Sequence, residues 1–269
     1  MTSPVQTVGY AGWVYGTGPS LGDPAEDLHE ASRLYPGVVY PDVTGGALLQ
    51  RSPDMRASAG RSVLRRTGLP AVELPAGRPL ARLLDDVLRA RRSNRRYGDA
   101  PISLDELAAL LRASYGVTGT LAGQELRCVP SGGALYPLEL YVVASNVAGL
   151  EPALYHYDPL RGALERIRGV QRPELEGLTP YDELVVPSAA VVAISAVFWR
   201  SRFKYGARAY RFALLEAGHV AQNYLLAATA LGLSACPVGG FFDRQVDALL
   251  GIDGLYEASL YLLPVGSAP

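Results

Sequence analysis

The sequence is almost without lysine. Lys and Arg together number 25, and Lys204 is the only lysine among them. Arg keeps its charge at any ordinary pH, whereas Lys can release its proton when burial or a nearby positive charge disfavours the ammonium. The single lysine therefore marks a candidate site of proton transfer, or a space too tight for a guanidinium. Drift under a strong arginine bias is the alternative interpretation.

Cysteine and histidine are also scarce. The two cysteines, Cys128 and Cys236, cannot make a disulfide framework. With three histidines in the chain, no Cys/His zinc pattern can be assembled, so we expect no metal site. The sequence also lacks a secretion signal and any uninterrupted apolar run of about 20 residues. We therefore expect a cytoplasmic protein with no membrane partner, and the net charge of −1 argues against nucleic acid as a partner.

The composition that remains is that of a globular protein, with 49% hydrophobic and 19% charged residues. Residues 1–78 are rich in Gly, Pro, Tyr and Arg and show little periodicity. They predict an N-terminal extension that wraps the core or contacts a peptide, with a short helix at 27–35. Residues 79–269 are expected to form the main domain. The aromatic residues of the extension that need packing partners are Tyr10, Trp13, Tyr15, Tyr35 and Tyr40.

The main domain alternates helical and strand patterns, which predicts an α+β fold with one sheet and helices around it. Ser103 and Glu106 form a capping box that opens a helix, and Gly116 ends that helix. Apolar spacing predicts an earlier helix with one face made by Leu80, Leu83, Leu84, Val87 and Leu88.

Strands are predicted at 137–145, on both sides of a turn at 158–162, at 189–198 and at 257–266. Residues 207–232 are helical and apolar nearly all round, so we expect a buried core helix or one buried in a subunit interface. Gly232 ends this helix, and Asp243 is expected to cap a short helix that runs to Leu250.

Four short segments could carry chemistry, although each alone also fits an ordinary loop or a solvated helix end. They are RARRSNRRYG (89–98), PSGGALYP (130–137), FWRSRFKYGARAYR (198–211) and CPVGG (236–240). Arginines and a serine can bind phosphate through forked hydrogen bonds. Glycine-rich loops let backbone N–H groups approach a ligand. In the third segment Lys204 stands beside Tyr205, and both can transfer protons.

The segments RRS-x-R-x-Y, PSGGALYPLELYVV, YHYD, KYGARAYR-x-x-x-x-E-x-GH-x-x-QN and CPVGG together resemble the nitroreductase superfamily. The closer resemblance is to the SagB-type (McbC-like) azoline dehydrogenases, over roughly residues 78–266. This resemblance implies a nitroreductase-like fold for 79–269, with a central mixed β-sheet, flanking helices and a long core helix. It also implies an intertwined homodimer that binds FMN at its interface.

The resemblance also assigns expected roles to individual residues. Lys204 and Tyr205 match the Lys-Tyr pair assigned to catalysis in the azoline dehydrogenases. The expected contacts to the flavin phosphate and ribityl chain are Arg91, Arg92, Ser93 and Arg95. The loop expected to meet the flavin from the partner subunit is Pro130, Ser131, Gly132, Gly133 and Leu135. The expected backbone edge near flavin N5 is Val238, Gly239 and Gly240.

The resemblance therefore implies an FMN-dependent dehydrogenase that oxidises thiazoline or oxazoline rings in a ribosomally synthesised, post-translationally modified peptide (RiPP). Its expected partners are a second copy of the chain, the azoline-containing precursor peptide and a cyclodehydratase complex. Two alternatives stay open: a general flavin oxidoreductase acting on nitro, quinone or non-ribosomal peptide substrates, and a non-catalytic scaffold subunit. One departure is that no Lys or Arg follows Arg244, where many superfamily members carry basic phosphate contacts.

Overall fold

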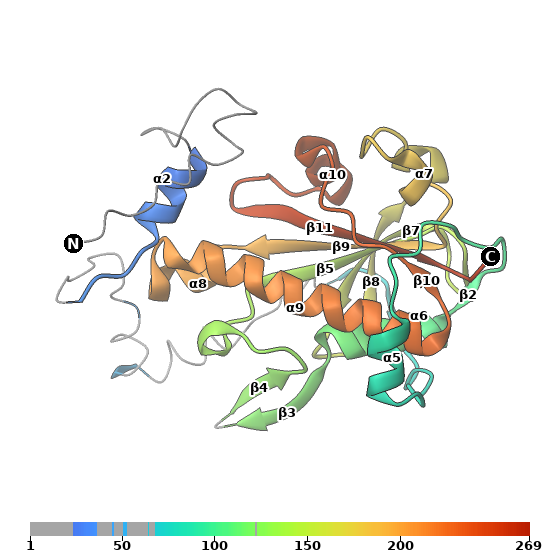
Figure 1. Cartoon of the computed structure of the whole chain (residues 1–269), viewed down its shortest axis with the longest axis horizontal. Helices are drawn as coiled ribbons and strands as arrows, with labels where there is room; N and C mark the ends of the chain where they lie inside the picture. Colours follow the sequence, from blue (N-terminus) through green and yellow to red (C-terminus); the bar gives the residue numbers. More distant parts are fainter. Residues whose placement is uncertain (1–23, 37–44, 46–50, 53–63, 65–67, 122) are drawn as a thin grey trace, which may run out of the picture.

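The structure is a computed structural model, and it describes residues 24–36, 45, 51, 52, 64, 68–121 and 123–269. Seven of the described strands form a central sheet in the order β1, β8, β7, β5, β9, β11, β10 (Figure 1). The α+β class expected from the sequence, with helices around one main sheet, is confirmed. The strands are β1 Ala71–Glu73, β5 Leu138–Ala144, β7 Ala153–Asp158, β8 Ala163–Gly169, β9 Ala190–Val197, β10 Ser234–Ala235 and β11 Glu257–Gly266.

The resemblance implied a mixed sheet, yet every neighbouring pair among these seven strands is antiparallel. The reason lies in the connections. β7 and β8 form a hairpin. Between β9 and β11 the chain runs the length of the sheet twice. α9 (Arg208–Leu231) carries it to the opposite end, and the segment that begins with β10 and pairs with β11 starts the return. The chain therefore enters β11 at the end where β9 finished. Parallel pairing among the described strands is confined to β2 (Ile102–Ser103) and β6 (Val147–Ala148).

Helices cover both faces of the sheet (Figure 1). α6 (Leu104–Tyr115) and α9 pack on one face, and α7 (Asp182–Val185) and α10 (Asp243–Leu250) pack on the other. β5 shows why both faces are filled: Leu138, Leu140 and Val142 enter the core under α9, while Tyr141 and Val143 enter the other core. Alternating side chains of one strand therefore serve two cores.

Smaller elements surround this frame. α5 (Leu84–Ala90) lies against α9, and α8 (Trp199–Tyr205) directly precedes α9. A hairpin of β3 (Val117–Leu121) and β4 (Gln124–Arg127) projects beside the sheet (Figure 1). Two 3-10 turns, η1 (Gly132–Ala134) and η2 (Arg172–Leu175), complete the described elements with α2 (Pro24–Ala31).

Local sequence signals account for several boundaries. The capping box predicted at the start of α6 is present, with the Glu106 N–H donating to Ser103 Oγ and the Ser103 N–H donating to Glu106. Gly232 ends α9 with a φ of 76°, which is the left-handed region that glycine tolerates. α10 differs in one detail: its N-cap is Phe242, and Asp243 is the first helical residue.

Two predicted apolar faces are exposed in the single chain. α5 begins only at Leu84, and Leu83, Leu84 and Leu88 are all more than half exposed. α9 is not buried all round, because Leu214 and Leu215 are exposed on the side away from the sheet. Of the two alternatives predicted for this helix, complete burial in the core of the single chain is not found, and burial in a subunit interface stays a prediction. The apolar pattern does not distinguish the core from a surface that a second chain covers.

Several contacts join the described part of the extension to the main domain, among them a hydrogen bond from the Leu64 N–H to Glu139 Oε1 at 2.9 Å. β1 adds an edge strand to the sheet by pairing with β8, so residues 71–73 belong to the core structure. The end of α2 is held by α9: Arg211 Nε donates to Ser32 Oγ at 2.6 Å and Arg208 Nη1 donates to Ser32 O at 3.0 Å. Tyr35 is exposed. Tyr10, Trp13, Tyr15 and Tyr40 lie outside the described residues.

Among the described helices, none combines the length and apolar character needed to cross a lipid bilayer.

Candidate active site

A strained loop connects the β3–β4 hairpin to β5. Gly133, Ala134 and Tyr136 have φ values of 64°, 51° and 45°, and the last two are unusual for residues with a Cβ. Hydrogen bonds hold the loop in this shape. The Tyr136 N–H donates to Ser131 Oγ at 2.9 Å, and Gln124 Nε2 donates to Ala134 O at 2.7 Å.

The predicted catalytic pair ends against this loop. Lys204 and Tyr205 are the last two residues of α8, and both side chains are half-buried. A Cβ at Gly133 would collide with Lys204 Nζ and would lie 2.8 Å from Tyr205 Oη, so both polar atoms reach the α-carbon of Gly133. Lys204 Nζ is also 5.2 Å from the centre of the Tyr205 ring. The structure therefore brings two of the four predicted segments together.

The Tyr205 ring is held from its other side by α9. It packs edge-on against Phe212, with ring centres 5.0 Å apart and an interplanar angle of 81°. A side chain at Gly132 would meet Phe212 Cδ2 at 3.2 Å and Tyr205 Cε2 at 3.4 Å. Small residues at 132 and 133 are therefore what lets the loop approach the Lys-Tyr pair closely.

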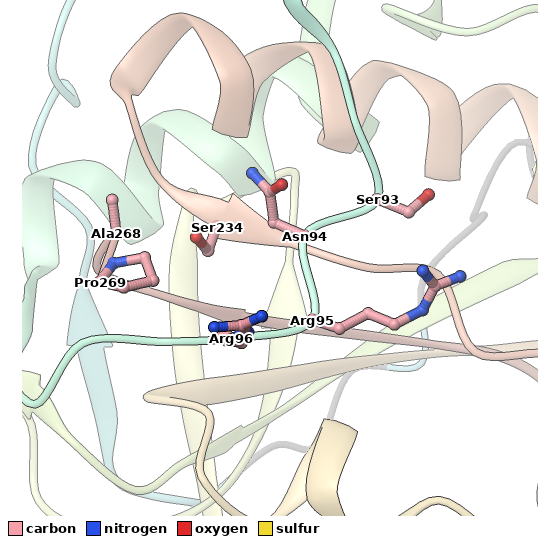
Figure 2. A pocket seen from close by; sticks show the side chains of 7 residues that line it. All are labelled: Ser93, Asn94, Arg95, Arg96, Ser234, Ala268 and Pro269. Carbon is pink, nitrogen blue, oxygen red and sulfur yellow. The ribbon is translucent and has the colours of Figure 1, made fainter.

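A second polar site lies at the far end of α9. Figure 2 shows a cavity that Ser93 and Arg95 line together with the adjacent Asn94 and Arg96. Ser234 of β10 and the terminal residues Ala268 and Pro269 complete its wall. Two guanidiniums and two serine hydroxyls in one open cavity form a donor set suited to a phosphate group.

The second site joins the other two predicted segments. The Asn94 N–H donates to Ala235 O at 2.9 Å, which places residues 93–95 beside β10. Burial raises the pKa of the Cys236 thiol, while the charge of Arg95 and its hydrogen bond to this thiol act against the shift. Beyond Cys236, Val238 is buried and pairs with Leu262, whereas Gly239 and Gly240 are exposed.

Some predicted residues lie away from these surfaces. Arg92 Nη1 donates to Arg89 O at 2.9 Å and to Arg91 O at 2.7 Å, so this guanidinium caps the end of α5. Neither Arg91 nor Arg92 lines the described cavity. The Leu135 side chain is buried beneath the loop, and Pro130 is exposed at its start.

The two sites stand at opposite ends of α9 (Figure 1). This helix has 24 residues and therefore spans about 36 Å at 1.5 Å per residue. The loop and the Lys-Tyr pair lie at its beginning, and the cavity lined by Ser93 and Arg95 lies beyond its end. One small cofactor cannot touch both sites of the same chain.

The family model described as Nitroreductase matches residues 88–267. This chain belongs to the nitroreductase family. The match includes the strained loop, the Lys-Tyr pair and the cavity residues except Ala268 and Pro269. It leaves α2, β1 and the beginning of α5 outside its bounds.

The relatives of this chain include one protein named as a nitroreductase and two named as peptide-processing proteins. MJ1384 of Methanocaldococcus jannaschii, whose name places it among nitroreductases, is 40% identical over 68% of this chain and 90% of its own. The microcin B17-processing protein McbC of Escherichia coli is 35% identical over 49% of this chain and 50% of its own. The trifolitoxin-processing protein TfxB of Rhizobium leguminosarum bv. trifolii is 31% identical over 59% of this chain and 46% of its own. The aligned part thus spans about half the length of each processing protein.

Solved structures show the same fold. A nitroreductase-type structure from Anabaena variabilis has a TM-score of 0.66 and 30% identity, and covers 77% of this chain and 45% of its own. The E. coli microcin synthetase McbBCD complex with truncated pro-MccB17 bound contains a chain with a TM-score of 0.58 and 24% identity, covering 90% of this chain and 87% of its own.

A buried ionic network supports the strained loop from the sheet side. His156 lies between Glu139 and Glu165, with ring nitrogens 2.7 and 3.0 Å from their carboxylate oxygens. Arg200 pairs with Glu139 and also donates to Tyr136 O at 3.3 Å. Burial acts to raise the pKa of Glu139, but the Arg200 charge and the His156 hydrogen bond outweigh it and lower the value to about 2.

Sequence analysis missed this network and several residues of the cavity. Asn94 and Arg96 belong to the same RRSNRR run as the predicted contacts, so the signal was present. Ser234 had no signal, because only the pairing of β10 with β11 brings it to the cavity. Glu139 and His156 alternate with apolar residues on buried strands, and their partners are distant in the sequence.

Proposed function

We propose that this protein is an FMN-dependent dehydrogenase that oxidises thiazoline or oxazoline rings to thiazoles or oxazoles in a ribosomally made peptide. The observation that carries the proposal is the approach of Lys204 Nζ and Tyr205 Oη to the same α-carbon, that of Gly133, in a strained loop. Relatives named for the processing of microcin B17 and trifolitoxin support a peptide substrate.

The residues present fit FMN. Ser93, Arg95 and Arg96 would hold its phosphate in the cavity of Figure 2, because guanidiniums and hydroxyls donate to phosphate oxygens. The exposed backbone of Gly239 and Gly240 would lie along the edge of the isoalloxazine ring. A structural relative from Exiguobacterium sibiricum, with a TM-score of 0.51 and 18% identity, is in complex with FMN. FMN supplies a two-electron acceptor when bound, with O2 as the terminal oxidant.

The Lys-Tyr pair would handle the proton of the reaction. Oxidation of an azoline removes a proton from the ring α-carbon and a hydride from the neighbouring ring carbon, and a carbon–carbon double bond forms between them. Tyr205 Oη or Lys204 Nζ would take the α-proton, and the other group would stabilise the charge that results. Phe212 fixes the Tyr205 ring, so that the phenol is held toward Gly133.

A second copy of the chain would complete the site. Because the cavity and the Lys-Tyr pair are separated by the length of α9, we propose that the loop of one copy meets the cavity of the other. The exposed leucines of α5 and α9 offer an apolar surface for such a dimer. Sedimentation should show a dimer, and Leu215→Asp should produce monomers that lose FMN. Leu255→Asp serves as the control, because Leu255 is an exposed leucine in the loop before β11 and belongs to neither α5 nor α9.

The likeness to MJ1384 favours a second candidate, a general flavin oxidoreductase driven by NAD(P)H. Anaerobic mixing separates the two. A thiazoline peptide should bleach the flavin absorbance without added nicotinamide if the protein is an azoline dehydrogenase. Bleaching by NAD(P)H, but not by the peptide, would establish the general oxidoreductase. A purified protein that carries no flavin and accepts none would instead be a scaffold subunit.

A further inference from the structure

Glu216 is a buried carboxyl group that the proposed mechanism does not use. It lies on α9 and is 2% exposed. It occupies the acidic position of the KYGARAYR-x-x-x-x-E-x-GH motif, which carried the family resemblance without a role for this residue. Tyr115 Oη donates a hydrogen bond to Glu216 Oε1 at 3.0 Å, and the Ser131 side chain hydrogen-bonds the same carboxyl group.

The bond to Ser131 connects Glu216 to the strained loop. Ser131 Oγ accepts the Tyr136 N–H at 2.9 Å. Because a carboxylate has no hydrogen to donate, Ser131 must donate its hydroxyl hydrogen to Glu216. Glu216 therefore anchors the residue that closes the loop around Gly133. Lys204 and Tyr205 end at the same Gly133.

We propose that Glu216 is a positioning residue: as a carboxylate it fixes the Ser131–Tyr136 loop against the Lys-Tyr pair, and as a carboxylic acid it releases that loop. The proposal rests on the proposed function only for the role of the Lys-Tyr pair. The hydrogen bonds of Glu216 and Ser131 lie within this chain and do not depend on the proposed function.

The neighbours of Glu216 explain why protonation would alter the loop. A carboxylate accepts from both hydroxyls, whereas a carboxylic acid also carries a hydrogen that needs a buried acceptor. The hydroxyl oxygens that contact the carboxyl group are those of Tyr115 and Ser131, and Ser131 Oγ already uses one of its two lone pairs to accept from Tyr136. Protonation therefore forces a rearrangement at one of these two hydroxyls.

The charged groups around Glu216 place this change near neutral pH. Burial raises the pKa of Glu216 to about 7, while the hydrogen bonds from Ser131 and Tyr115 oppose the shift. Arg127 of β4 and Arg200 of α8 also lower the pKa by their charges. Arg127 is itself fixed, with its guanidinium 4.0 Å from the centre of the Tyr115 ring. The carboxylate should therefore predominate only above about pH 7.

A matched control exists elsewhere in the fold. Glu257 is also buried, accepts from a tyrosine and a serine, and has its pKa raised by burial. Its donors are Tyr141 Oη at 2.9 Å and Ser195 Oγ at 2.6 Å. Both donors lie on sheet strands rather than in the loop. Glu257→Gln therefore removes a similar buried charge without touching Ser131.

The test is amide hydrogen exchange of the Tyr136 N–H between pH 6 and pH 8, corrected for the intrinsic exchange rate. In the wild-type protein, protection should rise about tenfold across this range, the factor that one net hydrogen bond supplies. Glu216→Gln should hold protection low at every pH, and Glu257→Gln should behave as the wild type. Ser131→Ala keeps Glu216 but cuts its link to the loop, so it should also abolish the rise.

A wild-type pH dependence that persists in Glu216→Gln would overturn the proposal. The same holds if Glu257→Gln abolishes the rise. The exchange measurement needs no substrate, so it stands apart from the azoline assay. If the protein fails to oxidise azolines but shows the Glu216-dependent rise in amide protection, the proposed function is contradicted and this inference still holds.

Discussion

The Nζ atom of Lys204 lies 5.2 Å from the centre of the Tyr205 ring, and both side chains end against the same glycine of the neighbouring loop. The pair and the loop are therefore in contact, although 70 residues of sequence lie between Gly133 and Lys204. Removing either polar atom tests its part in the chemistry.

Lys204→Ala and Tyr205→Phe should each keep the fold and the flavin but lose about 10²–10⁴-fold in turnover of an azoline peptide, the range typical of general acid–base groups. Lys204→Arg is the matched variant, because it keeps the charge but cannot release a proton and is bulkier. We expect this variant to be impaired as well. Full activity of Lys204→Arg would reduce the lysine to an electrostatic role, as stopped-flow measurement of flavin reduction would show.

Gly133→Ala should displace the Lys-Tyr pair. The residue has a φ of 64°, and an added Cβ would collide with Lys204 and Tyr205. Gly149→Ala is the matched control, because its φ is 81° and nothing lies within 4 Å of an added Cβ. Both variants pay a backbone cost of about 1 kcal/mol. Turnover should fall by at least about tenfold in Gly133→Ala only. Equal turnover in the two variants would show that the contact is not used.

Ser93→Ala and Arg95→Ala should weaken FMN retention, because each removes a donor to the phosphate. One charge-assisted hydrogen bond is worth about 1.5–3 kcal/mol, or roughly 10–150-fold in Kd. Arg92→Ala should have a smaller effect, since this guanidinium is held by carbonyls at the end of α5. Titration of the apoprotein with FMN, followed by flavin fluorescence, measures all three. A larger effect at Arg92 than at Arg95 would move the phosphate away from the cavity.

Glu139 should make the fold sensitive to acid. Its pKa is lowered from 4.5 to about 2 in the folded chain, so its stabilising contribution is present above pH 4.5 and is lost as the pH falls toward 2. The free energy of unfolding should therefore drop more steeply over this range in the wild type than in Glu139→Gln. Urea unfolding at several pH values measures the difference. Identical pH dependences of the free energy of unfolding would mean that the Glu139–Arg200 pair contributes nothing to the loss of stability in acid.

The sequence predicted the helices and strands better than the contacts of the candidate site. The S-x-x-E box at Ser103, the glycine at 232 and the apolar run of β9 are local signals, and each of them set an element correctly. The exposed leucines of α5 and α9 look the same in sequence whether they face a core or a second chain.

The site depended on contacts between distant segments. Lys204 stood out as the only lysine and Ser93 as the serine of an arginine-rich segment, but nothing local could show that Gly133 meets the lysine or that Ser234 borders the cavity. In the sequence, Glu216 stood out only as the acidic position of the KYGARAYR-x-x-x-x-E-x-GH motif. Its role follows from the fold, which places α9 beside both Tyr115 and Ser131.

Anaerobic stopped-flow mixing with a thiazoline peptide tests the proposed dehydrogenase most directly. The purified, FMN-loaded protein should lose its flavin absorbance in a single turnover without nicotinamide, and the peptide should lose two hydrogens by mass. Tyr205→Phe should slow this bleaching by about 10²-fold or more. Flavin that stays oxidised with the peptide, yet is reduced at once by NAD(P)H, would contradict azoline oxidation by this protein.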